Sequence, residues 1–405
     1  MSECELEKFT PNEEMIMMLI KKPEVKPLRP EFSSGPCAKH LGWDIQSISQ
    51  LAFLGRSHRG KDPRSQIAEV ISLTKQVLQI PDDYKVGIVP ASNTGAFEMA
   101  MWTMLGKRPV DVFAWENFGL AWANDVIKEL KIEDCSVISA DYGFLPDMTR
   151  LRSESDLCFT WNGTTSGVRV PDANWIPNGR EGLVLCDATS AVFGQKVDWR
   201  KLDATTFSWQ KAMGGEASHG VLVLSPKAID RLENFIPDRP LPKIFRLVKN
   251  GKLIEEIFTG DTINTPSMLC MADALDSLKW VQRMGGVDET VERANCNFAI
   301  LQNWLDKQDW IENLVKTKIY RSNTSVCLKV VSTEFLAFSN DQQRQFIKQL
   351  VALLEIEKVA YDVGGHREAP PGLRIWCGAT VESKDLLDLL PWLKWAFDTV
   401  KRSFK

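Results

Sequence analysis

Residues 205–225, TTFSWQKAMGGEASHGVLVLS, form the most informative stretch of this 405-residue chain. They indicate a buried strand, then Lys211, a glycine turn and a second apolar strand. The end of a buried strand is a costly place for a solvated ammonium group. Two interpretations of Lys211 stand: a lysine that snorkels to water, or a Schiff-base lysine whose pKa is lowered by desolvation.

A neighbouring apolar run helps to choose between them. Gly182–Thr189, GLVLCDAT, places Asp187 at the carboxyl end of a strand, 24 residues before Lys211. Ligands of open parallel sheets bind at the carboxyl ends of the strands. An aspartate there can pair with a pyridinium nitrogen and keep the ring an electron sink, although alone it could equally cap a turn. Together, Asp187 and Lys211 indicate a pyridoxal phosphate site.

Short apolar runs, several of them without polar alternation, alternate with helical patterns such as Gly95–Leu105 and Gly119–Lys131. Such runs are typical of strands covered on both faces, and the alternation predicts an α/β domain with a mostly parallel seven-stranded sheet sandwiched by helices. The seven predicted strands are Lys85–Pro90, Asp111–Trp115, Cys135–Ala140, Leu157–Trp161, Gly182–Cys186, Thr205–Trp209 and Gly220–Leu224.

The hydrophobic pattern changes after about residue 265, where two long amphipathic stretches, Ser267–Met284 and Val287–Gln308, precede a C-terminal unit. We expect an N-terminal extension at residues 1–28 and a large domain at 29–285, whose first segment joins the small domain or a dimer interface. A smaller α+β domain is expected at 286–405. Its predicted strands are Ser325–Val331 and Leu373–Gly378, and its predicted helices are Asp341–Ile356 and Ser383–Lys401.

The composition excludes several classes of protein. Lys plus Arg total 49 and Asp plus Glu 53, a net charge of −4 that argues against a general nucleic-acid surface. The nine cysteines include no C-x-x-C pair, and with four histidines they supply no zinc motif. The acidic N-terminus, with a short apolar run at Met15–Ile20, is not typical of a signal or transit peptide. We expect a cytoplasmic protein without a metal, nucleic-acid or membrane partner.

Three further positions fit a cofactor, each with an ordinary alternative. Ser92 and Asn93 begin a helix after a strand, where backbone amides suit a phosphate or form a plain N-cap. Trp122 follows the next strand and could stack on a planar ring or belong to the core. Thr164, in WNGTTSG, could bond a phenolic oxygen or cap a turn.

In this order, the segments resemble the class V aminotransferases, which are fold type I pyridoxal-phosphate enzymes, and most closely the phosphoserine aminotransferase family. The resemblance runs from about Phe32 to the C-terminus. The matching segments are FSSGP (Phe32–Pro36), SHRGKD (Ser57–Asp62), the Ser92–Ala96 loop, WNGTTSG (Trp161–Gly167), CDATS (Cys186–Ser190), WQK (Trp209–Lys211), NTPSM (Asn264–Met268) and GGHREAPPGLR (Gly364–Arg374).

The resemblance implies roles around the cofactor ring. Lys211 would hold pyridoxal 5'-phosphate as a Schiff base and act as general acid/base, while Asp187 would hold the pyridinium nitrogen. Trp122 would stack on the ring, and Thr164 would bond its phenolic oxygen.

The resemblance also implies how the phosphate is held. Ser92, Asn93 and Gln210 would bind the cofactor phosphate, and Asn264 and Thr265 would reach that of the neighbouring subunit in a homodimer with shared active sites. Many family members carry an arginine in the loop that here reads Ser92-Asn93-Thr94, so amides and hydroxyls must meet most of the charge.

For the substrate, Arg374 would clamp the α-carboxylate with its planar fork. His366 and Arg367, with His58 and Arg59 from the partner subunit, would receive a distal phosphate or carboxylate. The implied reaction is a ping-pong transamination of 3-phosphohydroxypyruvate with L-glutamate, giving O-phospho-L-serine and 2-oxoglutarate in serine biosynthesis. Whether 4-phosphohydroxythreonine, a vitamin B6 precursor in pyridoxine biosynthesis, is also a substrate stays open.

Three alternatives remain. An alanine– or serine–glyoxylate aminotransferase would leave the two His-Arg pairs without a purpose, because its substrates lack a distal anion. A cysteine desulfurase usually has a histidine before the Schiff-base lysine, where this chain has Gln210, and Cys377 lies within an expected strand. A non-catalytic paralogue acting as a scaffold would be indicated by loss of Lys211 or Asp187, and both are present.

Overall fold

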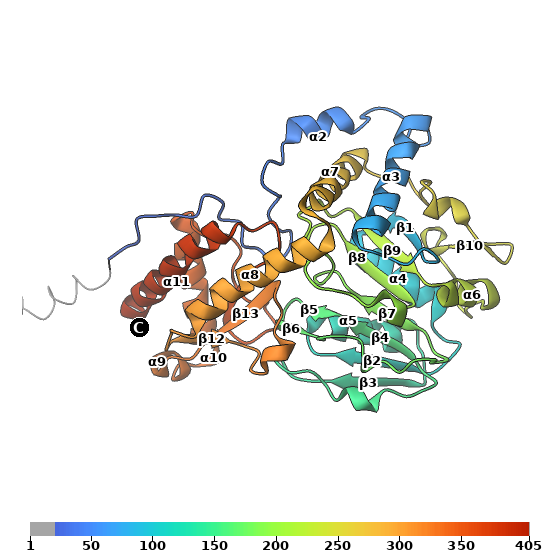
Figure 1. Cartoon of the computed structure of the whole chain (residues 1–405). Coiled ribbons are helices and arrows are strands. Elements are labelled where there is room, and N and C mark those ends of the chain that lie inside the picture. The colour runs from blue at the N-terminus through green and yellow to red at the C-terminus, as the bar shows by residue number, and fades with distance from the viewer. Residues whose placement is uncertain (1–20, 405) are drawn as a thin grey trace, which may run out of the picture.

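The computed structural model describes residues 21–404 and shows a large α/β domain beside a smaller one (Figure 1). The large domain is built on a seven-stranded sheet of order β1-β9-β8-β7-β4-β2-β3, in which every strand except β9 runs in the same direction. The predicted mostly parallel sheet is therefore confirmed. The strands are β1 (Lys85–Pro90), β2 (Val110–Ala114), β3 (Cys135–Ser139), β4 (Asp156–Thr160), β7 (Val184–Asp187), β8 (Ala204–Ser208) and β9 (His219–Leu224).

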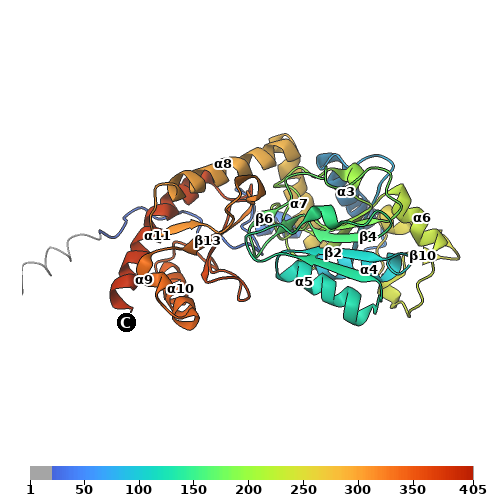
Figure 2. The ribbon, with the colours of Figure 1, turned by 90° about the horizontal axis from the view of Figure 1, so that it is seen from below.

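Helices cover both faces of this sheet (Figures 1 and 2). On β1, Val86 and Ile88 pack into the core cluster that contains α3 and α7, while Val89 faces the cluster of α4 and α6. With both faces covered, the strands need no polar alternation, which explains their uninterrupted apolar runs. The helices are α3 (Lys61–Val77), α4 (Ser92–Met104), α5 (Asn117–Asn124, continued by a π-helical turn at Asp125–Glu129), α6 (Pro226–Asn234) and α7 (Met268–Met284).

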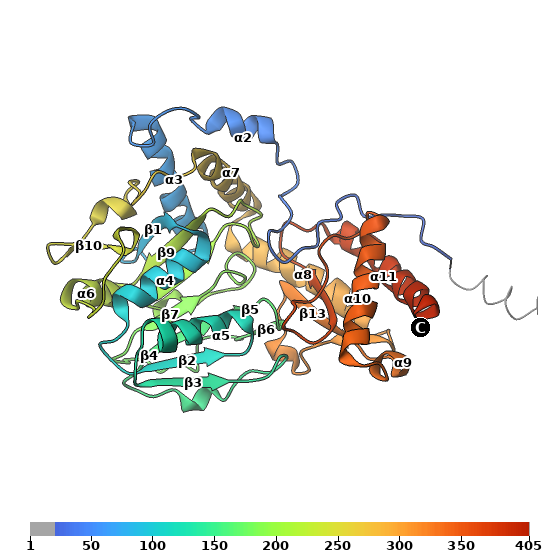
Figure 3. The same cartoon turned by 180° about the vertical axis from the view of Figure 1, so that it is seen from behind.

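Helix α7 leads toward the small domain and ends at Gly285 and Gly286, whose positive φ angles of 111° and 90° suit residues without a side chain. The long helix α8 (Val287–Leu305) then runs to a three-stranded antiparallel sheet (Figure 3). The strands are β12 (Ile311–Asn313), β13 (Ser325–Val330) and β14 (Gly372–Trp376), and the other helices are α9 (Thr333–Leu336), α10 (Asn340–Ile356) and α11 (Ser383–Ser403).

The N-terminal segment lies along the small domain before it enters the large one (Figure 1). The backbone carbonyl of Val25 accepts from Trp392 Nε1 at 2.7 Å, and that of Pro30 accepts from the Tyr361 amide at 2.9 Å. The run Met15–Ile20 lies outside the described residues. The boundaries at residues 28 and 285 stay predictions, although the first segment of the large domain does contact the small one.

Short elements complete the fold: α2 (Ile45–Leu51), the hairpin of β5 (Asn162–Gly163) and β6 (Val168–Arg169), and the hairpin of β10 (Val248–Lys249) and β11 (Lys252–Leu253). Within residues 21–404, no helix has the length and apolar character needed to cross a membrane.

Candidate active site

A cavity of about 110 Å³ lies at the carboxyl ends of β4, β7 and β8. There the register sets Asp187, the last residue of β7, opposite Thr160 of β4 and Thr206 of β8. The cavity brings together all seven residues that were predicted to hold the cofactor from within one chain. They are Ser92, Asn93, Trp122, Thr164, Asp187, Gln210 and Lys211.

Asp187 is buried in the wall of this cavity and held by neighbouring donors. Its carboxylate accepts from Trp122 Nε1 at 3.1 Å and from the Thr189 backbone amide and hydroxyl at 3.0 and 2.6 Å. Burial raises the pKa of Asp187, and the donors at Thr189, Trp122 and Asn93 oppose that rise because they favour the charged form. A fixed carboxylate with little solvent around it suits a cationic ring nitrogen.

Lys211 follows β8 by three residues and is partly buried, with its amine directed at the segment FSSGP. Its Nζ donates to the backbone carbonyl of Ser34. Gly35, next to Ser34, has a φ of 147°, which favours glycine, and a Cβ there would force the Nζ to shift. Desolvation is the main reason that the pKa of Lys211 is lowered, and nearby Arg374 lowers it further. A lowered pKa keeps the amine neutral over a wider range of pH, and the neutral amine is the nucleophilic form.

Side chains at the end of the cavity beside α4 leave polar atoms free for a ligand. Ala91 and Ser92 have positive φ angles of 69° and 56°, which turn the chain sharply from β1 into α4. Asn93 Oδ1, Gln210 Oε1 and the Thr160 hydroxyl are buried here, with no hydrogen-bond partner within the described residues 21–404. Buried polar atoms without partners are rare in folded proteins, so these fit a polar group bound beside the first turn of α4.

Of the five predicted substrate residues, Arg374 and His366 lie near this cavity, and Arg367 follows His366 along the chain. Arg374, on β14, is partly buried with its Nε unpartnered, and its charge acts on Lys211. The His366 ring lies 6.3 Å from the Phe118 ring on α5, and burial, then Arg374 and Arg367, lower its pKa. Arg367 is largely exposed and contacts the carboxylate of Glu368 at 3.4 Å.

The four residues expected from a partner subunit do not line this cavity. His58 and Arg59 lie between α2 and α3, a segment far from the small domain in one chain (Figures 1 and 3). Asn264 and Thr265 lie in an exposed loop before α7. Within one subunit the two His-Arg pairs therefore do not meet, and their role stays a prediction about a dimer.

Comparison with known proteins identifies the family. The chain is 53% identical over 380 residues to the phosphoserine aminotransferases of Methanosarcina mazei and Methanosarcina barkeri, covering 94% of this chain and 100% of each relative. The chain belongs to the phosphoserine aminotransferase family. No protein-family model matches it.

Solved structures of phosphoserine aminotransferases have the same fold. The chain matches that of Bacillus circulans subsp. alkalophilus with a TM-score of 0.72 at 20% identity, covering 93% of this chain and 99% of the other. It matches that of Cytophaga hutchinsonii with a TM-score of 0.74 at 19% identity, covering 91% and 99%. An alanine–glyoxylate aminotransferase from Nostoc sp. matches with a TM-score of 0.73 at 17% identity, covering 96% and 99%. The predicted fold type is therefore confirmed.

Sequence reasoning missed the other residues that line the cavity, among them Ser190, Asn162 and Glu116. Ser190 accepts from the Thr164 hydroxyl at 2.8 Å and from Asn162 Nδ2 at 2.9 Å, which fixes the turn after β4. Glu116 is almost fully buried beside them. Ser190 and Asn162 belong to motifs already matched, CDATS and WNGTTSG, whereas no sequence signal singled out Glu116.

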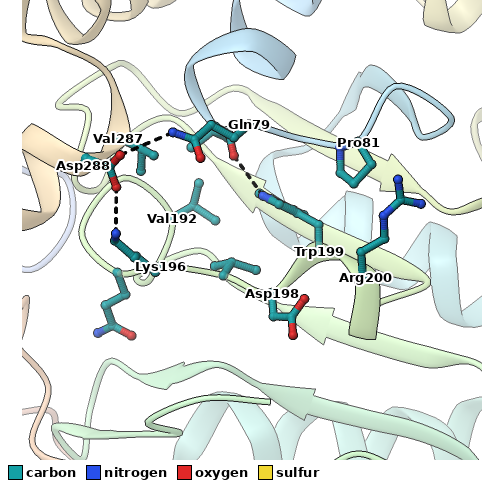
Figure 4. Close-up of a pocket in the computed structure, with 12 residues that line it drawn as sticks. Gln79, Pro81, Val192, Lys196, Asp198, Trp199, Arg200, Val287 and Asp288 are labelled. Carbon is teal, nitrogen blue, oxygen red and sulfur yellow. Dashed lines mark hydrogen bonds and ion pairs between the residues drawn. The ribbon is translucent and has the colours of Figure 1, made fainter. Parts of the chain in front are cut away.

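A larger cavity of about 270 Å³ lies elsewhere, between the end of α3 and the start of α8 (Figure 4). Its two cations have carboxylate partners: Lys196 contacts Asp288 of the same cavity at 2.9 Å, and Arg200 contacts Asp83, outside the lining, at 2.9 Å. The Trp199 indole donates to the backbone carbonyl of Leu78. This cavity is larger than the one at Lys211, but none of its lining residues belongs to a strand, and its lysine, Lys196, is paired with Asp288.

Proposed function

We propose that this chain is a pyridoxal-phosphate-dependent phosphoserine aminotransferase that converts 3-phosphohydroxypyruvate and L-glutamate into O-phospho-L-serine and 2-oxoglutarate. The observation that carries the proposal is one cavity in which a desolvated lysine, Lys211, shares the walls with a buried carboxylate, Asp187, and an indole, Trp122. These are the groups that a pyridine ring with an aldehyde and a phosphate requires. Family membership at 53% identity supports the same reaction.

The cofactor, when bound, supplies an electron sink for the bonds at the substrate Cα. Lys211 would hold it covalently and, once displaced by the substrate amine, move a proton at the Cα through Nζ. Asp187 would keep the ring nitrogen protonated. Trp122 would cover one ring face, and the Thr164 hydroxyl, which donates to Ser190 here, would turn its hydrogen to the phenolic oxygen.

The phosphate would be bound by Ser92, Asn93 and Gln210, which supply hydroxyl and amide groups and the first-turn amides of α4. None of the three carries a full charge, so the dianion needs additional donors. In the homodimer that we propose, the partner's Asn264 and Thr265 would supply them.

Substrate anions would be divided between two ends of the site. Arg374 would bind the α-carboxylate through its guanidinium, whose Nε has no protein partner. His366 and Arg367 would face the distal phosphate or carboxylate, joined by His58 and Arg59 of the other subunit. These four residues all supply hydrogen-bond donors, so they suit a substrate with a distal phosphate better than a substrate with a neutral side chain.

A dimer also accounts for apolar surface on the large domain. Leu41, Ile45, Leu51 and Leu54, in and around α2, are each at least half exposed. Exposed apolar residues gathered on one short segment are typical of interfaces rather than of free surface. This segment leads directly to His58 and Arg59, so the same contact would bring that pair to the neighbouring site. We further propose that the enzyme acts in the cytoplasm.

A glyoxylate aminotransferase is the second candidate, because the alanine–glyoxylate enzyme from Nostoc sp. shares the fold. A cysteine desulfurase is less consistent with the structure, since Cys377 is fully buried and burial raises the pKa of its thiol. Steady-state rates with phosphoserine, phosphohydroxythreonine, serine and alanine, each with 2-oxoglutarate, test the proposal. We expect phosphoserine to be preferred by roughly 100-fold or more over alanine, since several charged hydrogen bonds are at stake. Equal rates would contradict it.

A further inference from the structure

Glu116 is a buried carboxylate in the cavity wall to which none of the roles above is assigned. It stands immediately before α5 with 1% of its surface exposed, and it is the N-cap of that helix. A glutamate is rarely buried to this extent unless its charge is met by donors.

Each of its carboxylate oxygens has donors from a different wall of the cavity. Oε1 accepts from the Gly119 amide in the first turn of α5 at 3.0 Å. Oε2 accepts from the hydroxyl and the amide of Thr165 at 2.6 and 3.3 Å. Two of these partners are backbone amides, which only donate, and the Thr165 hydroxyl supplies a third hydrogen. Burial raises the pKa of Glu116, but these donors oppose that rise because they favour the ionised carboxylate.

The two segments joined in this way carry predicted cofactor and substrate contacts. Helix α5 holds Trp122 and Phe118, and Phe118 contacts the His366 ring. The turn after β4 holds Thr164, next to Thr165. The space for the carboxylate is tight, since a Cβ at Gly163 would lie 2.8 Å from Glu116 Cγ.

Several charged or titratable groups surround Glu116. Its charge acts on Lys211 after β8, on Tyr142 after β3 and on Cys327 of β13, while Asp187 of β7 acts on Glu116. Lys211 also faces Cys37 and Arg374. The site thus holds two buried carboxylates, of which the pyridinium nitrogen requires one.

We propose that Glu116 is a positioning residue: its ionised carboxylate ties the first turn of α5 to the turn at Trp161–Gly167, and its charge favours a cation at Lys211. The inference rests on the proposed cofactor. Trp122 above the ring and Thr164 at its edge are then held by one shared anion, so that neither wall moves without the other.

Two variants separate the two roles of Glu116, which are the hydrogen bonds that join α5 to the turn after β4 and the negative charge near Lys211. Glu116→Gln removes the charge and replaces one acceptor oxygen by a donor, whereas Thr165→Val removes the shortest hydrogen bond and leaves the charge. In cofactor-free protein, hydrogen exchange of peptides covering residues 115–124 and 162–168 should be faster by about threefold or more in both variants. In protein loaded with pyridoxal phosphate, the pH midpoint of the visible absorbance should fall by about 0.5 unit or more in Glu116→Gln and stay unchanged in Thr165→Val.

Asp111→Asn is the matched control. Asp111 is also a fully buried carboxylate with several donors, Arg152 and Ser155 among them, but it does not line the cavity. It should leave the absorbance midpoint and both peptides unchanged. Wild-type exchange in both test variants would overturn the positioning role, and an unmoved midpoint in Glu116→Gln would overturn the charge role. If wild-type protein shows no visible band with pyridoxal phosphate, the proposed function fails instead. If Glu116→Gln does not fold, Thr165→Val still tests the tie.

Discussion

The Trp122 indole donates its N–H to the Asp187 carboxylate across 3.1 Å, joining α5 to the end of β7 inside the cavity. One side chain would therefore cover the cofactor ring and also orient the carboxylate that holds the ring nitrogen. A change at Trp122 should therefore affect both the covering of the ring and the orientation of Asp187.

Trp122→Phe should weaken cofactor binding while keeping an aromatic face. Loss of one hydrogen bond to a buried charge costs about 1.5–3 kcal/mol, so the Kd for pyridoxal phosphate should rise by roughly 10-fold or more. Fluorescence or absorbance titration measures it. Trp102→Phe, on α4 against Phe245, is a control that should bind as wild type does, and an unchanged Kd in Trp122→Phe would contradict a role for the indole N–H.

Lys211→Ala should abolish turnover, because among residues 21–404 no other lysine lines the cavity to move the proton. The visible absorbance of the lysine-bound cofactor should disappear with it. Absorbance spectra and a coupled glutamate assay check both effects. Activity close to that of wild type in this variant would refute the assignment of Lys211.

Arg367→Ala should impair phosphoserine far more than alanine. Losing a charged hydrogen bond to phosphate costs about 1.5–3 kcal/mol, so kcat/KM for phosphoserine should fall by roughly 10- to 150-fold. Alanine lacks the distal anion and serves as the internal control. An equal loss for both substrates would remove the anion-binding role.

Arg231→Ala should strongly destabilise the large domain. Asp156 and Arg231 form a buried pair at 2.8 and 3.1 Å, so removing the arginine leaves an uncompensated buried carboxylate. Such a loss costs about 3–5 kcal/mol of unfolding free energy, measurable by urea denaturation. The exposed pair of Arg200 and Asp83 is the comparison: Arg200→Ala should change the unfolding free energy far less, because solvent screens this pair. Similar losses in the two variants would contradict this.

His219 should make stability fall in mild acid. Burial lowers its pKa to about 4, and its Nε2 accepts from the Ser267 amide at 3.3 Å, which requires the neutral ring. The unfolded histidine takes up its proton near pH 6.5, so the folded state loses about 1.4 kcal/mol per pH unit between about 6.5 and 4. Unfolding free energies at pH 7 and 5 should differ by about 2 kcal/mol more in wild type than in His219→Gln, and an identical pH dependence would refute the assignment.

The seven strands were all predictable, because strands covered on both faces are apolar throughout and stand out between polar turns. Asp187 and Lys211 were found as candidates for a related reason: a charged residue at the end of such a strand conflicts with its surroundings unless it has a function. Glu116 had no such signal. It follows the apolar run at Phe113–Trp115, yet only the folded chain shows that its three donors come from α5 and from Thr165, 49 residues away.

Local sequence thus determined what depends on neighbours along the chain: the strands, the helix starts and the residue types suited to a pyridine cofactor. Tertiary structure decided what depends on approach between distant segments. It set Ser34 against Lys211, 177 residues apart, and left the His58-Arg59 pair remote from His366 and Arg367 within one subunit. The reason is physical: hydrophobic periodicity specifies which face is buried, but not which distant face covers it.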